Sequence, residues 1–244
     1  MLQIIYKRLL LSALLAFVLS ISIFAQSGNL PYVDGRFIHF GFSLGMSSMN
    51  FGITPSRDSI GTGADKKVYE MGVSDLSPGF SVGIITDMRL NRYLNLRFTP
   101  TLNLESRKLI YKIVNSIEKP TTLSITSIPV CLPIYLKYSA ERKDNYRPYV
   151  IWGGGIALDL GRNTTTDWVL LKPLDFYTEF GVGCDIYFSF FKLAPELKFA
   201  VGFNNLVTPL DQRVAGTITT ENEYYTRALS KLTSRMLTLT FNFE

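Results

Sequence analysis

Apolar and polar residues alternate at every second position through much of this chain. The clearest run spans 175–188, where Phe176 and Phe180 share one side while Asp175 and Glu179 share the other. A period of two predicts β-strands, because successive side chains of a strand point to opposite faces. The run exceeds the roughly 3–10 residues of most strands in globular proteins. Its length suits a tilted strand that crosses a membrane.

Other segments alternate in the same way, and together they predict about eight strands. These segments are 38–47, 80–89, 94–105, 128–138, 147–159, 193–203 and 237–243. Some of them contain prolines, which cannot donate a hydrogen bond to a neighbouring strand. We therefore expect bulges or bends at Pro100, Pro129, Pro133 and Pro195.

The connections between these segments alternate between short and long. The short ones lie near 90–93, 140–146 and 189–192, and the long ones near 52–77, 113–122, 161–173 and 207–230. Bacterial outer-membrane barrels have this asymmetry, with short periplasmic turns and longer extracellular loops. A soluble β-sandwich would also alternate, but it has no reason to sort its connections this way. The sequence thus predicts an all-β fold, a transmembrane antiparallel β-barrel over residues 37–244 in the outer membrane.

The polar faces of the predicted strands carry many charged residues. These are Asp87, Arg89, Arg97, Glu105, Lys137, Asp159, Glu179, Asp185, Glu196 and Lys198. In a small barrel they would point inward and pair with one another, because an unpaired buried charge is costly. An eight-stranded barrel is just wide enough for side chains to fill it. We expect a polar, plugged lumen and no general diffusion pore, with a transport or proton-relay role for the charges as the alternative.

The N-terminal residues read as a secretory signal. Lys7 and Arg8 precede an apolar run over 9–24, and the small residue Ala25 ends it. This order predicts a cleavable signal peptide over residues 1–25, although an uncleaved transmembrane helix remains the alternative. Residues 26–36 would then form a short periplasmic segment before the barrel.

Charge and composition exclude several classes of protein. The formal net charge is +5, two units of which come from the predicted signal peptide, and clustered Lys/Arg runs are absent from the sequence. We therefore predict no nucleic-acid partner. The 17 Phe and 13 Tyr residues suit a barrel that faces lipid.

Candidate catalytic and metal-binding residues do not form a constellation in the sequence. His39 is the only histidine, and the alternation places it on the inward face, with no partnered nucleophile nearby. Cys131 is predicted inward and Cys184 outward on strands that are not neighbours, so we expect no disulfide. The glycines at 153–155 are not followed by the Lys-Ser/Thr of a phosphate loop. We predict no enzyme activity, no catalytic or metal-ligating residues and no cofactor.

Two strand segments carry a family resemblance. Residues 127–138, SIPVCLPIYLKY, resemble the IP-x-x-L-K-Y strand of outer-membrane barrels of the Bacteroidota, and residues 147–155, RPYVIWGGG, resemble their RPYV-x-x-G-x-G strand. The segments 40–46 and 79–83 fit the same group. Taken whole, and especially over residues 39–51, the mature chain is similar to the PorT family of the type IX secretion and gliding machinery.

The resemblance implies a component needed for secretion, or for assembly of the apparatus, of proteins that bear a C-terminal sorting domain. It brings no catalytic residues. The expected partners are outer-membrane lipid, the barrel insertion machinery acting on the terminal strand 237–243, and other secretion-system proteins at the loops or periplasmic turns. Two other functions stay open: an adhesion or structural barrel acting through loops such as 52–77 and 207–230, and a narrow solute channel.

Overall fold

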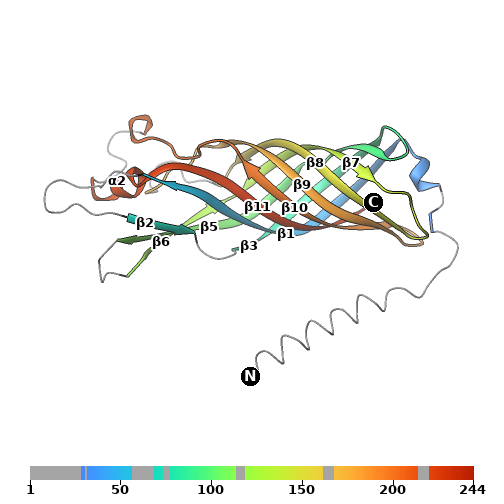
Figure 1. The fold of residues 1–244 in the computed structure, drawn as a ribbon, viewed down its shortest axis with the longest axis horizontal. Coiled ribbons are helices and arrows are strands. Elements are labelled where there is room, and N and C mark those ends of the chain that lie inside the picture. The colour runs from blue at the N-terminus through green and yellow to red at the C-terminus, as the bar shows by residue number, and fades with distance from the viewer. Residues whose placement is uncertain are drawn as a thin grey trace, which may run out of the picture.

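In the part of the chain that the structure describes, eleven β-strands form one sheet that winds around a long axis and closes into a barrel (Figure 1). The structure is a computed structural model that describes residues 29–30, 32–56, 69–73, 77–113, 119–161, 168–213 and 220–244. The predicted signal peptide, residues 1–25, lies outside this part of the chain, as do parts of each predicted long connection.

The strands pair antiparallel around the ring. They are β1 (Ile38–Pro55), β2 (Tyr69–Val73), β3 (Pro78–Arg89), β4 (Leu94–Phe98), β5 (Thr101–Ile113), β6 (Thr121–Ser127), β7 (Pro129–Ser139), β8 (Tyr146–Asp159), β9 (Leu174–Tyr187), β10 (Lys192–Gly202) and β11 (Leu229–Phe243). Pairing of β1 with β3 on one edge and with β11 on the other closes the ring.

We call each run of the chain from one end of the barrel to the other a crossing. Three crossings are each made of two consecutive strands. β4 and β5 follow one another across Thr99 and Pro100, and β6 and β7 across Ile128. β2 and β3 both pair with β5, at different points along it. Eleven strands therefore make eight crossings, which confirms the predicted barrel of about eight strands.

The prolines affect the sheet unequally. Pro100 lies at the break between β4 and β5, and Pro129 begins β7 after a break, as expected of residues without an N–H. Pro133 stays paired with Gly155 inside β7. Pro195 keeps its partner on β11 but has none on β9. The predicted irregularities are thus confirmed at the first two positions and reduced to a local gap in pairing at Pro195.

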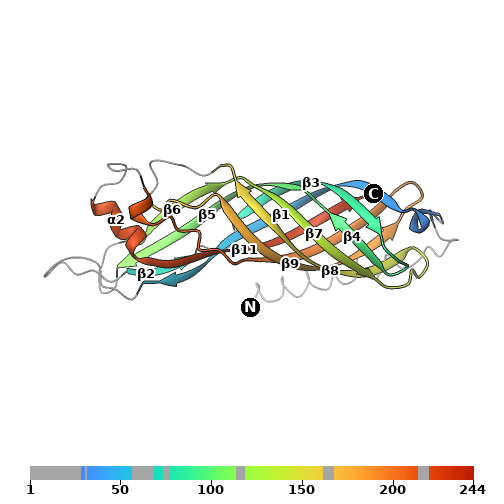
Figure 2. The ribbon, with the colours of Figure 1, turned by 90° about the horizontal axis from the view of Figure 1, so that it is seen from above.

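The two ends of the barrel differ (Figure 2). We call one the turn end, where residues 90–93, 140–145 and 188–191 connect neighbouring strands. The other, the loop end, carries β2, the short helix η3 (Leu210–Gln212) and the helix α2 (Thr220–Arg227). Among the described residues, none of the helices is long and apolar enough to cross a membrane.

Several strands extend farther toward the loop end than the sequence predicts. β1 reaches Pro55 and β11 begins at Leu229, whereas the alternation predicted 38–47 and 237–243. The predicted long connection 113–122 is likewise flanked by strand up to Ile113 and from Thr121. The prediction of these boundaries was wrong because the polarity of the two strand faces is exchanged there.

The reversal is clearest in β1. Phe42 and Met46 point outward and are exposed, while Ser43 and Ser47 are buried inside. Farther along the strand, the inward residues become apolar and the outward ones polar, and Phe51 is buried. The barrel therefore has an apolar exterior near the turn end and an apolar interior near the loop end.

Candidate functional site

The lumen near the turn end is filled by charged side chains that pair across it. Arg97 of β4 lies 2.8 Å from Asp87 of β3, 3.2 Å from Glu196 of β10 and 2.9 Å from Glu244, which follows β11. The side chain of Arg97 is only 1% exposed. One guanidinium thus joins three carboxylates from different parts of the ring, the arrangement that a buried arginine requires.

Lysines complete this charged layer. Lys137 of β7 donates to both carboxylate oxygens of Asp185 of β9, at 2.9 and 2.8 Å. Lys192 lies 2.7 Å from Glu244, and Lys198 lies 3.5 Å from Glu196. Each of these three lysines thus has a carboxylate beside it in the lumen.

Tyrosines fill the space between the charges. Tyr149 donates to Glu196 at 2.7 Å, and Tyr135 donates to Glu179. The ring of Tyr149 also lies 4.0 Å from the ammonium group of Lys137, a cation–π contact. The predicted polar, plugged lumen is confirmed in this half of the barrel.

The inward positions of nine of the ten predicted charged residues are confirmed, and Arg89 is the exception. Arg89 is half-buried at the turn end and donates to the carbonyl of Asn91. It sits at the last position of β3, where the strand leaves the lumen. His39 lies on the inward side of β1 near the same end, half-buried, with its Nε2 3.3 Å from the carbonyl of Arg36.

Two charges of this layer, and Arg107 farther along the lumen, were not among the residues predicted to point inward. Lys192 was placed in a turn at 189–192, but it begins β10 and points inward. Glu244 continues the alternation of β11 by one residue beyond the outward Phe243. Extending each alternating run by one residue would have found both.

A second polar layer lies farther along the lumen. Arg107 of β5 lies 2.8 Å from Asp159 at the end of β8 and also donates to Ser127. The backbone N–H of Ile128 donates to Asp159 at 2.9 Å, so this carboxylate also bridges the break between β6 and β7. The cysteines lie as predicted: Cys131 is buried in the lumen, Cys184 is on the other face of β9, and both are free.

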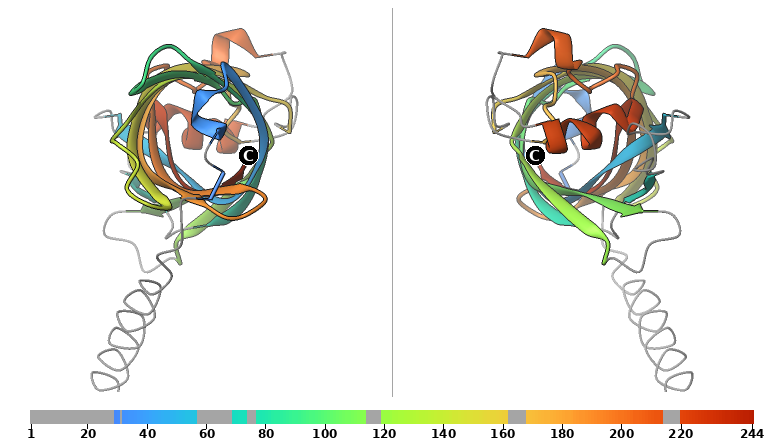
Figure 3. Two further views of the ribbon diagram at one scale, coloured as in Figure 1. Left: turned by 90° about the vertical axis from the view of Figure 1, so that its right-hand side faces the viewer. Right: turned by 90° about the vertical axis from the view of Figure 1, so that its left-hand side faces the viewer.

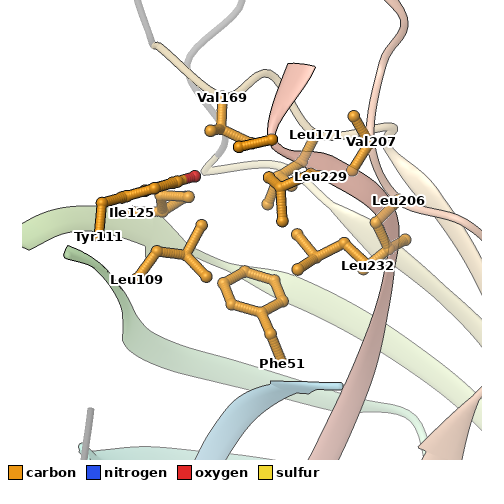
Figure 4. Packing of buried hydrophobic residues seen from close by; sticks show 11 residues of the cluster. Phe51, Leu109, Tyr111, Ile125, Val169, Leu171, Leu206, Val207, Leu229 and Leu232 are labelled. Carbon is orange, nitrogen blue, oxygen red and sulfur yellow. The ribbon is translucent and has the colours of Figure 1, made fainter. Parts of the chain in front are cut away.

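The loop end is closed by an apolar cluster (Figure 4). Its buried members are Phe51, Leu109, Tyr111, Ile125, Val169, Leu171, Leu206, Val207, Ala228, Leu229 and Leu232. They come from β1, β5, β6, β11 and the connections that follow β8 and β10. Tyr225 of α2 packs edge-on against Tyr111, with ring centroids 4.9 Å apart. Trp168 stacks on the ring of Tyr225, with centroids 4.6 Å apart. The guanidinium of Arg107 lies over the ring of Phe51, at 4.6 Å.

The turn end is covered by the segment that precedes β1 (Figure 3). Its short helix η1 (Val33–Gly35) carries Asp34, which accepts a hydrogen bond from Tyr187 at 2.6 Å. Asp34 also lies 3.4 Å from both Arg142 and Arg147. Asn29 donates from its backbone to Asn145 at 2.8 Å. These contacts fix the segment across the mouth of the barrel.

The outer surface near the turn end is apolar and aromatic. Trp152 is 64% exposed and Phe180 57%, although both belong to the middle of long strands. Phe42 stacks on Phe243 with ring centroids 4.9 Å apart. Such large exposed patches need an apolar partner, and an aromatic border is typical of barrels in a lipid bilayer.

The described residues contain no group of three or more His, Cys, Asp or Glu side chains that could hold a metal ion. His39 contacts the backbone carbonyl of Arg36, and its register partner on β3 is Asp87. The arrangement consists of paired charges packed in the lumen, with a segment or cluster covering each end.

A comparison with protein families agrees with this architecture. Residues 24–208 match a family model described as an outer membrane protein beta-barrel domain. No curated protein matches the chain. Among solved structures, the outer membrane protein OprG from Pseudomonas aeruginosa has a TM-score of 0.43 at 10% identity, covering 84% of this chain and 91% of its own.

Proposed function

The chain belongs to the outer membrane protein beta-barrel domain family, and on this premise we propose that it is a non-enzymatic component of the type IX secretion machinery. In this role it serves the export of proteins with C-terminal sorting domains, directly or by helping to assemble the apparatus. It is an integral β-barrel of the outer membrane. The likeness of the whole mature chain to the PorT family, especially over residues 39–51, supports the finer assignment.

The filled lumen is the observation that carries this proposal. Arg97 and its three carboxylates occupy the turn half, and the apolar cluster around Leu232 occupies the loop end. An eight-stranded barrel has no room for a folded protein beside such side chains. A secretion role for this molecule is therefore a contact role, played by surfaces at the two ends.

The two ends would meet different partners. Short turns of bacterial outer-membrane barrels face the periplasm and long loops face the exterior. The turn end, with the segment before β1, is then available to periplasmic components, and the loop end, with α2, to components at the cell surface. Partners at both ends are part of the proposal.

A deletion strain tests the proposal. Loss of the gene should leave proteins with C-terminal sorting domains unprocessed in the periplasm, because the apparatus lacks a contact. Cell fractionation and immunoblotting of such a cargo protein measure this, and a plasmid copy of the gene should restore secretion. Detergent sensitivity of the cells serves as a control for general damage to the outer membrane.

One other function is favoured by a specific observation. The loop-end extension of β1, β2, β5 and β6, which lies beyond the apolar exterior, would suit a structural or adhesion barrel. The same strain separates the two. Normal cargo secretion together with lost surface attachment would replace the secretion role by the adhesive one.

A further inference from the structure

A pocket of about 330 Å³ opens at the turn end, between the segment before β1 and the turns 90–93 and 140–145. Its charged lining residues are Asp34, Arg89, Arg92, Glu141, Arg142 and Arg147. Four arginines face two carboxylates there, so the pocket has an excess of two positive charges. The position at the turn end places it outside the apolar exterior, on the periplasmic side.

Two of these arginines are already fixed in place. Arg147 donates to the carbonyls of Ala140 at 3.0 Å and Arg92 at 2.6 Å. Arg142 donates to the carbonyl of Asp144 at 2.8 Å and lies 3.7 Å over the ring of Tyr187. Because guanidinium groups that are held in place lose little entropy on binding, they are suited to accept an oxyanion.

Asp34 of the protein itself shows that Arg142 and Arg147 can bind a carboxylate. Its carboxylate lies 3.4 Å from Arg142 and 3.4 Å from Arg147, longer than the 2.7–2.9 Å that is usual for strong charge-assisted hydrogen bonds. One carboxylate is thus shared loosely between two guanidinium groups, and it also accepts a hydrogen bond from Tyr187.

The other two arginines add charge with little internal compensation. Arg92 pairs with Glu141 at 3.1 Å, but these side chains are 70% and 63% exposed. Arg89 donates to the carbonyl of Asn91, and no carboxylate in the described part of the chain forms an ion pair with it. Exposed pairs contribute little energy, so both guanidinium groups can exchange partners.

We propose that this pocket binds an acidic peptide segment of a periplasmic protein, whose carboxylates pair with Arg89 and Arg92 and reach toward Arg142 and Arg147. Two observations favour a peptide over a lipid headgroup. The pocket opens on the barrel mouth, beside Arg147 on the inward side of β8 and Asp34 in the segment before β1, and not on the apolar exterior. Its volume also accommodates several side chains, beyond a single phosphate. The site goes beyond the secretion role and does not depend on it.

The test uses the mature chain in zwitterionic detergent micelles and a fluorescent peptide that contains six consecutive glutamates. Fluorescence anisotropy measures its affinity against a peptide in which glutamine replaces every glutamate. Binding of the acidic peptide alone is expected, and it should weaken as salt rises, because partly exposed charges are screened. Equal binding of both peptides overturns the proposal.

Paired substitutions locate the site. Arg89→Gln with Arg92→Gln should weaken binding of the acidic peptide by about tenfold or more, since two charge-assisted contacts are lost. Lys108→Gln with Lys112→Gln removes the same charge from exposed positions near the loop end and should leave the affinity unchanged. Equal losses in the two variants would show a nonspecific charge effect and overturn the proposal.

A gain of affinity provides evidence that misfolding cannot imitate. Asp34→Asn removes the internal carboxylate from the pocket, so the acidic peptide should bind more tightly. Full displacement of the peptide by millimolar inorganic phosphate would identify a small-anion site instead. Displacement by vesicles containing phosphatidylglycerol, but not by vesicles of neutral lipid, would identify a lipid site. Either result overturns the peptide assignment.

Discussion

At the residue scale, Arg97 determines how the charged layer is held together. Its guanidinium contacts Asp87, Glu196 and Glu244, which come from three strands or their ends. Replacing the arginine removes part of the positive charge that balances three carboxylates in the lumen. The remaining lysines lie beside Glu196 and Glu244 and cannot reach all three.

Arg97→Met should therefore lower the free energy of unfolding by about 3–5 kcal/mol, the cost of removing one partner from a buried ion pair. Urea titration of the protein in lipid vesicles, followed by heat-modifiable migration on gels, measures this. Arg235→Met, at an exposed position of β11, is the matched control and should change little. Equal midpoints for Arg97→Met and the native chain would contradict the central role of Arg97.

Alternation in the sequence was sufficient to place most of these side chains. Residues such as Glu179 and Lys198 lie in the middle of long runs, where the inward face is unambiguous. Arg89, Lys192 and Glu244 lie at strand ends, where a period of two has too few repeats to fix the face. The partners of each charge could not be predicted, because they depend on the stagger between strands that are distant in sequence.

At the scale of elements, the reversal along β1 and β11 separates the membrane half from the loop end. The outward face of β11 carries Leu237 and Leu239 near the turn end, whereas its inward face carries Leu232 near the loop end. Alternation alone does not show whether an apolar face contacts lipid or the interior of the barrel. The sequence pattern therefore predicted the membrane-spanning parts well and ended the strands too early.

Leucine-to-alanine substitutions test this division. Leu232 is fully buried in the apolar cluster, so Leu232→Ala should destabilise the closed loop end by about 2–5 kcal/mol. Leu197→Ala removes the same atoms from the exterior, where Leu197 is 47% exposed, and should have little effect. The rate of proteolysis at the loop end of the folded barrel measures the difference. Equal rates for the two variants would argue against an apolar cluster that closes this end.

At the scale of the whole molecule, the barrel is filled in layers. The segment around Asp34 covers the turn end, the network around Arg97 fills the lumen behind it, and the cluster around Leu232 closes the loop end. Each layer has a different chemistry and occupies a different level of the barrel. We expect the removal of one layer to leave the others in place.

We therefore expect no steady conductance from the purified protein in planar bilayers. Deleting residues 29–36 should not produce one either, because the charged layer and the apolar cluster remain. Conductance steps that scale with the amount of native protein, and that are absent with a heat-denatured sample, would instead support a narrow solute channel.

The position of Glu244 has a consequence for the order in which the barrel is made. Arg97 and Lys192 both depend on its carboxylate, and that carboxylate arrives only when β11 has docked between β10 and β1. A ring that is still open would leave Lys192 without this ion pair and Arg97 with two of its three carboxylates, a costly intermediate. The last strand to be inserted is thus also the one that neutralises the lumen, which favours concerted closure over stepwise completion.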